Sequence, residues 1–188
     1  MENDAEFAEQ GLDAVIGLGA NVGEPQAALI RALEELARLG ELGAISHLYR
    51  TLPVGGPPQP DFLNAAARLF FRGSPSELLG HLLALEVGAG RHRRERWGPR
   101  SLDLDILWVQ GLELSQPGLE IPHPRLRQRA FALRPLVDVA PEARDPEDGV
   151  LYATVLGELG CEGVEDLGNR WVGAGLGAAA PGMDRPCP

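Results

Sequence analysis

The residue types most capable of chemistry are concentrated in one stretch of the chain, residues 90–105. Five arginines fall within ten residues there: Arg91, Arg93, Arg94, Arg96 and Arg100. Two aspartates, Asp103 and Asp105, follow in a segment that alternates polar and apolar residues. This alternation predicts a strand with both carboxylates on one face and Leu102, Leu104 and Ile106 on the other. Acidic and basic groups therefore meet at one end of a predicted strand.

Paired carboxylates beside clustered arginines suit the handling of phosphate groups. Two carboxylates on one face repel each other unless a cation lies between them. Oxygen ligands with open positions favour Mg²⁺, which keeps several waters and completes its shell with substrate phosphates. Two such ions could hold a phosphoryl group while arginines neutralise its oxygens. The competing interpretation is a solvated strand face with surface ion pairs, which the density of arginine beside the strand disfavours.

The elements that must position these residues run in the order β-α-β-β-α-β between residues 13 and 109. We expect strands at residues 13–18, 44–49, 62–71 and 102–109, and helices at residues 29–40 and 74–88. Ser74 and Glu77 have the spacing of a capping box at the start of the second helix. On the third strand, Phe62 and Asn64 share one face. This order predicts an α+β fold with a ferredoxin-like core, in which helices pack on an antiparallel sheet.

Beyond residue 109 the pattern predicts additional C-terminal elements. These are short strands at residues 112–114 and 119–121, a helix from Arg125 that Pro135 breaks, and a helix near residues 150–159. We therefore expect one folded domain at residues 13–160. An acidic extension at residues 1–12 precedes it, and a tail at residues 161–188 follows, whose end is too poor in large apolar groups to become ordered.

The composition excludes several classes of protein. Acidic residues outnumber basic ones 27 to 17, so the net charge of −10 argues against broad, sequence-independent binding of nucleic acid. The chain contains no lysine, which excludes a lysine Schiff base and a Walker A loop. No apolar run approaches the roughly 20 residues that span a membrane, and the acidic start is unlike a signal peptide.

Cysteine content and helix patterning bear on location and assembly. Two cysteines, Cys161 and Cys187, are too few for a disulfide framework or a multi-cysteine zinc site, so a reducing cytoplasm fits best. No long exposed apolar helix face calls for a second chain, which is compatible with a monomer.

Residues 96–107, Arg-Trp-Gly-Pro-Arg-Ser-Leu-Asp-Leu-Asp-Ile-Leu, resemble the signature of the 6-hydroxymethyl-7,8-dihydropterin pyrophosphokinases of folate biosynthesis. Segments 17–23, 49–51, 59–65 and 121–124, with Arg129 and Phe131, resemble further motifs of that family in the same order. The resemblance extends from about residue 15 to about residue 141. It implies a cytoplasmic enzyme that transfers diphosphate from ATP to the hydroxymethyl group of a reduced pterin and releases AMP. Its implied requirements are two Mg²⁺ ions and ATP as co-substrate, with small-molecule partners and neither nucleic acid nor membrane.

The resemblance also implies roles for individual residues. Those implied to be catalytic are Arg91, Arg100, Asp103 and Asp105, of which the two aspartates hold the metal ions. Those implied to bind ATP are Glu86, Arg91, Arg93, Arg96, Trp97, Arg100, His123 and Arg129. Those implied to bind pterin are Thr51, Val54, Phe62, Asn64, Asp103 and Phe131, with the two phenyl rings on either side of the pterin. A structural role is the alternative for His123, and an ion pair with a loop arginine is the alternative for Glu86.

Two other functions compete with this interpretation. Gly17, Gly19 and Gly23 follow a predicted strand and mimic a dinucleotide fingerprint, but their spacing is one residue too long and the predicted sheet is not doubly wound. A ferredoxin-like RNA-binding module is the second rival. The net charge of −10 and the aromatic content of 5% disfavour it. Without a bound metal ion, Asp103 and Asp105 would also repel the phosphates of RNA.

Overall fold

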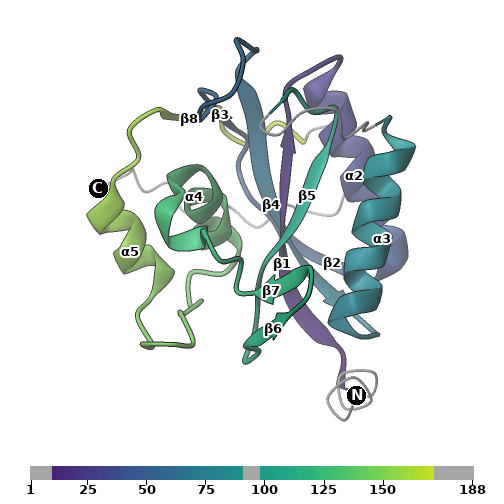
Figure 1. Cartoon of the computed structure of the whole chain (residues 1–188), viewed down its shortest axis with the longest axis vertical. Helices are drawn as coiled ribbons and strands as arrows, with labels where there is room; N and C mark the ends of the chain where they lie inside the picture. The colour runs from purple at the N-terminus through teal and green to yellow at the C-terminus, as the bar shows by residue number, and fades with distance from the viewer. Residues whose placement is uncertain (1–9, 91–97, 172–188) are drawn as a thin grey trace.

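A computed structural model describes residues 10–90 and 98–171 of the chain (Figure 1). The first half contains β1 (Leu12–Ala20), α2 (Pro25–Leu39), β2 (Glu41–Ile45), β3 (Tyr49–Thr51), β4 (Phe62–Phe71), α3 (Pro75–Gly88) and β5 (Asp103–Val109). The second half contains β6 (Leu114–Gln116), β7 (Leu119–Ile121), the 3-10 helix η1 (Leu126–Gln128), α4 (Ala130–Val139), α5 (Tyr152–Leu159) and β8 (Val164–Asp166).

The strands of the main sheet run antiparallel in the order β5-β1-β4-β3-β8, and β2 also pairs with β4. The strand β1 therefore lies between β4 and β5, as the β-α-β-β-α-β order predicts. β6 and β7 form a separate two-stranded sheet. The expected α+β fold with a ferredoxin-like core is confirmed.

Helices cover both faces of the sheet and give the domain three layers. Figure 1 shows α2 and α3 on one side of the sheet and α4 and α5 on the other. Side chains of β1 alternate between the two cores: Leu12, Ile16 and Leu18 pack toward α2 and α3, and Val15 packs in the cluster that contains α4 and α5. The face toward α2 and α3 is apolar along its length, so chemistry must be sought on the other face.

The two helices between the strands begin where local sequence favours them. In α3, the Ser74 hydroxyl accepts a hydrogen bond from the Glu77 N–H and the Glu77 carboxylate accepts one from the Ser74 N–H, which confirms the capping box. In α2, buried Leu29, Leu33 and Leu36 repeat at helical spacing.

The segment expected as one strand at residues 44–49 is instead divided between β2 and β3. Ile45 pairs with Ala67 and Tyr49 pairs with Asn64, so the segment from Ile45 to Tyr49 contains one residue more than the segment of β4 opposite it. The Ser46 hydroxyl accepts from the Ala66 N–H at 2.8 Å, where a backbone carbonyl would serve in a regular ladder. This bulge could not be read from apolar alternation.

The expected break at Pro135 is wrong, because Pro135 lies inside α4. Its missing N–H costs one helix hydrogen bond, but Leu133, Leu136 and Val139 are buried and hold the helix against the sheet. The helix also begins later than expected, since η1 precedes it. The strand expected at residues 112–114 lies at Leu114–Gln116, while Leu112 packs in the core.

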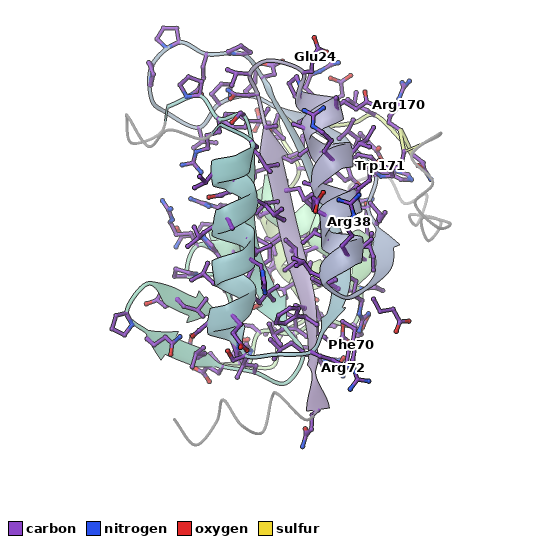
Figure 2. All side chains as sticks on the ribbon, turned by 90° about the vertical axis from the view of Figure 1, so that its right-hand side faces the viewer. Glu24, Arg38, Phe70, Arg72, Arg170 and Trp171 are labelled. Atoms are coloured by element: carbon purple, nitrogen blue, oxygen red, sulfur yellow. The ribbon has the colours of Figure 1, made fainter. Side chains whose placement is uncertain are left out.

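The expected domain boundary at residue 160 is too early. β8 pairs with β3 beyond it, and Trp171 is buried with its indole N–H donating to the Ser46 carbonyl at 2.7 Å. Figure 2 shows Arg170 and Trp171 beside α2, and the Gln26 side chain donates to the Arg170 carbonyl at 3.0 Å. β8 and Trp171 join residues 161–171 to the domain. The average composition of the tail does not reveal these two contacts.

No helix within residues 10–90 and 98–171 is long and apolar enough to cross a membrane.

Candidate active site

The candidate site lies at the end of the sheet where β1 finishes and β4 and β5 begin. Gly19 of β1 pairs with Asp103 of β5 on one side and with Asn64 of β4 on the other. Tyr49 of β3 pairs with Asn64 and continues the row. These residues share the face of the sheet that α4 covers, because the alternate positions on β4 and β5 pack in the core beneath α2 and α3.

Gly19 forms an open floor between the polar side chains of its neighbours. A Cβ atom placed on Gly19 would lie 3.2 Å from the Asn64 Oδ1 and 3.8 Å from the Asp103 Cβ. Contact at 3.2 Å is tight, so glycine keeps this position clear. A flat ligand could therefore lie across β1 with Asn64 on one side and Asp103 on the other.

Asp103 and Asp105 lie on the same face of β5, as expected. Burial raises the pKa of Asp105, and the negative charge of Asp103 raises it further, while His123, Arg100 and Arg129 oppose the shift. The Arg100 guanidinium donates a hydrogen bond to the Asp103 carboxylate. The repulsion between the carboxylates is the interaction that a bound cation would relieve.

The donor set at this pair fits a hard divalent cation. It consists of the carboxylate oxygens of two residues. Within the described part of the chain, these residues are not joined by a third His, Cys, Asp or Glu to form a larger group of metal ligands. A cation bound by two carboxylates completes its coordination with water and substrate phosphates, which is the usual arrangement for Mg²⁺.

Several arginines gather opposite the aspartates. Burial lowers the pKa of Arg129, and the positive charges of Arg125 and Arg100 contribute, while Asp105 and Asp103 oppose them. A guanidinium keeps its proton despite such a shift, so the cluster stays cationic. Positive charge concentrated beside two carboxylates suits a ligand with several phosphate groups.

His123 is held close to Asp105 by backbone contacts. Its N–H donates to the Leu107 carbonyl at 2.9 Å, and its Nδ1 accepts from the Arg125 N–H at 3.1 Å. Burial lowers the pKa of His123, although the charge of Asp105 opposes this. With Nδ1 accepting, the neutral ring carries its proton on Nε2 and can donate from there.

The residues expected to bind pterin lie along β3, β4 and α4. The Asn64 amide N–H donates to the Thr51 hydroxyl at 2.7 Å, which fixes the amide and leaves its Oδ1 beside Gly19. Phe62 lies two positions from Asn64 on β4 and is half-buried. Phe131 is half-buried at the start of α4, with the Arg129 guanidinium 5.5 Å from its ring centroid. Val54 is 65% exposed in the loop between β3 and β4.

Glu86 anchors the start of β5 from the end of α3, and its two expected roles stay predictions. It is 2% exposed at the end of α3, and its Oε1 accepts from the Leu104 N–H at 2.8 Å. Leu104 separates the two aspartates, so Glu86 fixes the backbone of β5 from the side opposite β1. Arg91, Arg93, Arg96 and Trp97 lie outside the described residues.

Asn21 is a site residue to which the sequence assigned no role. It is 2% exposed, and its amide N–H groups donate to the Gln59 Oε1 at 2.9 Å and the Pro60 carbonyl at 3.0 Å. Its Oδ1 accepts from the Arg100 N–H at 2.8 Å, and its own N–H donates to the Arg100 carbonyl at 2.9 Å. Asn21, directly after β1, thus holds two segments in place: the loop before β4, and Arg100, which precedes the two aspartates of β5. Its place in the glycine-rich loop between Gly19 and Gly23 was the sequence feature that could have indicated a role at the site.

Comparison with known proteins agrees with this geometry. A sequence model of the 7,8-dihydro-6-hydroxymethylpterin-pyrophosphokinase family matches residues 15–141. The chain belongs to this family. Its activity is the transfer of diphosphate from ATP to 6-hydroxymethyl-7,8-dihydropterin in folate biosynthesis, and the RNA-binding alternative is not favoured.

Individual pyrophosphokinases are similar over most of their length. A 2-amino-4-hydroxy-6-hydroxymethyldihydropteridine pyrophosphokinase of Synechocystis is 41% identical over 161 residues, which cover 85% of this chain and 82% of the relative. A pyrophosphokinase of the same name from Pseudomonas aeruginosa is 43% identical over 154 residues, covering 81% and 94%. The mitochondrial folate synthesis bifunctional protein of Arabidopsis thaliana is 43% identical over 138 residues, but the match covers only 24% of it.

Solved structures of larger proteins share the pyrophosphokinase fold. A crystal structure of HPPK-DHPS in complex with substrates aligns with a TM-score of 0.60 at 13% identity, covering 79% of this chain and 43% of the other. A Plasmodium falciparum HPPK-DHPS triple mutant with pteroate aligns with a TM-score of 0.59 at 15% identity, covering 83% and 46%. The chain spans less than half of these bifunctional chains, and at such identities the likeness concerns the fold.

Proposed function

We propose that the end of the sheet around Gly19 is the place where ATP and the reduced pterin meet. The observation that carries this assignment is the row Asp103, Gly19 and Asn64, which sets a carboxylate and an amide on either side of an open glycine. A phosphate site and a site for a flat heterocycle thereby adjoin on one face. Transfer between two substrates requires such adjacency.

Asp103 and Asp105 are the residues that would hold magnesium. Their oxygen donors fit the ion, and burial followed by the neighbouring charge of Asp103 raises the pKa of Asp105, a repulsion that a cation would relieve. Bound there, divalent ions would neutralise phosphate oxygens and lower the pKa of the substrate hydroxyl. We propose two ions, since the reaction needs charge neutralised on both the transferred and the departing phosphates.

The arginines bind and orient the triphosphate. The Arg100 guanidinium, held by Asn21 through its backbone, can grip two phosphate oxygens with parallel donors. Arg129 and the Nε2–H of His123 lie within electrostatic range of the aspartates and would contact the same phosphates. Arg91, Arg93, Arg96 and Trp97 retain their predicted roles at this site.

The pterin would lie over Gly19 between the rings of Phe62 and Phe131. Aromatic stacking on each face contributes about 0.5–1.5 kcal/mol beyond burial. The Asn64 Oδ1 accepts from the polar edge of the pterin, and Thr51 holds the Asn64 amide in place. The hydroxyl oxygen of the pterin then forms a bond to the β-phosphorus of ATP and loses its proton to water, the bond from that phosphorus to the α–β bridging oxygen breaks, and AMP departs with that oxygen.

Identification of the nucleotide product tests the function. Protein, ATP, Mg²⁺ and 6-hydroxymethyl-7,8-dihydropterin are incubated together, and the nucleotides are separated by ion-exchange chromatography. The expected product is AMP in equal amount to the pterin diphosphate. ADP would show an ordinary kinase, and unchanged ATP would refute the assignment. Omission of Mg²⁺ with a chelator is the matched control and should leave ATP intact.

A monomeric state and a cytoplasmic location are further proposals from the sequence. Size-exclusion chromatography with light scattering would test the first, and a molar mass of two chains would overturn it.

A further inference from the structure

A buried polar network joins strand β3 to helix α4 next to the proposed pterin site. The Tyr49 hydroxyl donates to the Asp138 Oδ2 at 2.5 Å and accepts from the Arg134 Nε at 3.2 Å. The Arg134 Nη2 lies 3.2 Å from the Asp138 Oδ1, and the backbone N–H of His47 donates to the Asp138 Oδ2 at 3.2 Å. The side chains of Arg134 and Asp138 are only 9% and 2% exposed.

The network occupies the same row and the same helix face as the proposed pterin residues. On the sheet side, Tyr49 pairs with Asn64, and Thr51, two positions further on, pairs with Phe62. On the helix side, Phe131, Arg134 and Asp138 follow one another at spacings of three and four residues, so they share one face of α4. The contacts that hold β3 against α4 therefore lie one and two helical turns from Phe131.

Stability alone is a poor reason to keep these charges buried. Two desolvated charges with one hydroxyl contribute little net stability, and an apolar set of similar volume is often equally stable. Burial is strong enough here to raise the pKa of Asp138 despite the opposing effects of Tyr49 and Arg134. What such a network does supply is a fixed distance and register between two elements, because its hydrogen bonds are directional.

We propose that Tyr49, Arg134 and Asp138 are positioning residues that set the separation between β3–β4 and α4, and thereby the separation of Phe62 and Phe131 across the reduced pterin. This inference rests on the proposed function, since it assumes that the pterin lies between those rings. None of the three residues needs to touch the substrate.

The chain offers a matched pair of variants, because its two tyrosines, Tyr49 on β3 and Tyr152 on α5, are both buried. Tyr49→Phe removes the hydroxyl that joins β3 to Arg134 and Asp138 of α4, and Tyr152→Phe removes a hydroxyl from α5. Calorimetry measures the Kd of the reduced pterin and, separately, of a non-hydrolysable ATP analogue with Mg²⁺. We expect Tyr49→Phe to raise the Kd of the pterin about tenfold, which corresponds to the loss of one strong aromatic stacking interaction. The Kd of the nucleotide should stay unchanged. Tyr152→Phe should change neither Kd.

A second variant separates positioning from folding. Tyr49→Phe combined with Arg134→Met and Asp138→Leu replaces the hydroxyl and both charges by apolar groups of similar volume, so the melting temperature of this triple variant should stay near that of the parent protein. The pterin Kd should nevertheless stay raised, because the directional contacts are absent. Parental pterin affinity in Tyr49→Phe, or recovery of pterin affinity in the apolar triple variant, would overturn the positioning role. Failure of the parent protein itself to bind pterin would instead refute the proposed function and this inference with it.

Discussion

The two faces of the sheet are made from the same strands but have opposite compositions. Toward α2 and α3, strands β1, β4 and β5 present apolar side chains that pack in one core. Toward α4, at the end where β1 finishes, the intervening positions present carboxylates, an amide and a glycine. One residue along β5 thus separates a core position from a chemical one, as at Leu104 and Asp105. The comparison teaches that stability and chemistry reside on alternate residues and should be separable by substitution.

The largest contrast is expected between these two neighbours. Asp105→Ala removes a proposed metal ligand and should lower turnover by about 10³-fold, since metal assistance is worth several kcal/mol. Its cooperative melting transition should persist. Leu104→Ala should instead cost about 2–5 kcal/mol of unfolding free energy and leave turnover of the folded fraction near the parent value. Steady-state AMP release and urea unfolding measure the two effects, and loss of the melting transition in Asp105→Ala would make that residue structural.

On the polar face, a positive charge at position 100 should not support turnover unless it has the forked donor geometry of arginine. Arg100→Lys keeps a positive charge beside Asp103 but loses the forked donor, so we expect turnover to fall roughly 10–100-fold. Arg38 is the matched control, because it lies on α2 with its side chain 70% exposed and pairs with Glu35 (Figure 2). Arg38→Lys should leave turnover unchanged. Near-parental turnover in Arg100→Lys would count against its proposed grip on phosphate.

The glycine floor gives a smaller and more selective effect. Gly19→Ala places a methyl group 3.2 Å from the Asn64 Oδ1, on the surface where the pterin is proposed to lie. We expect the KM for pterin to rise about tenfold while the KM for ATP stays near its parent value. Gly43→Ala in β2 is the control, since its Cβ would lie 3.5 Å from the nearest atom. Equal effects of the two substitutions would show that Gly19 matters to the strand and not to the ligand.

The smallest expected effect is a dependence of stability on pH at Asp138. Burial raises its folded-state pKa above the ordinary value of an aspartate, so the folded protein binds the proton more tightly than the unfolded chain does. Stability from this group is therefore greatest at low pH and is lost as pH rises through the raised pKa. The difference in unfolding free energy between the parent and Asp138→Asn should fall over that range in urea titrations. A difference that rises with pH would mean that Arg134 and Tyr49 outweigh burial.

Much of this contrast between faces was predictable from the sequence. Alternation on residues 102–109 gave the shared face of Asp103 and Asp105, and the capping box at Ser74 gave the start of α3. These features depend on neighbours within a few residues, so local pattern suffices to find them. The antiparallel order of the sheet followed from the order of the elements.

Features that depend on distant partners were not predictable. Asn21 acquires its role from Gln59 and Arg100, which are far away in sequence, and Glu86 meets Leu104 only after α3 packs on β5. The division of β2 from β3 depends on Ser46 meeting Ala66 across strands. The place of Trp171 in the core likewise requires the chain to return past β3. Such contacts are properties of the assembled sheet.

The central claim is that Asp103 and Asp105 together hold divalent cations against the phosphates of ATP. A crystal structure of the protein with Mg²⁺ and a non-hydrolysable ATP analogue tests it most directly. We predict metal density about 2.0–2.1 Å from oxygens of both carboxylates and of the phosphates. Carboxylates that face bulk water, with the nucleotide bound elsewhere or without metal, would contradict the account.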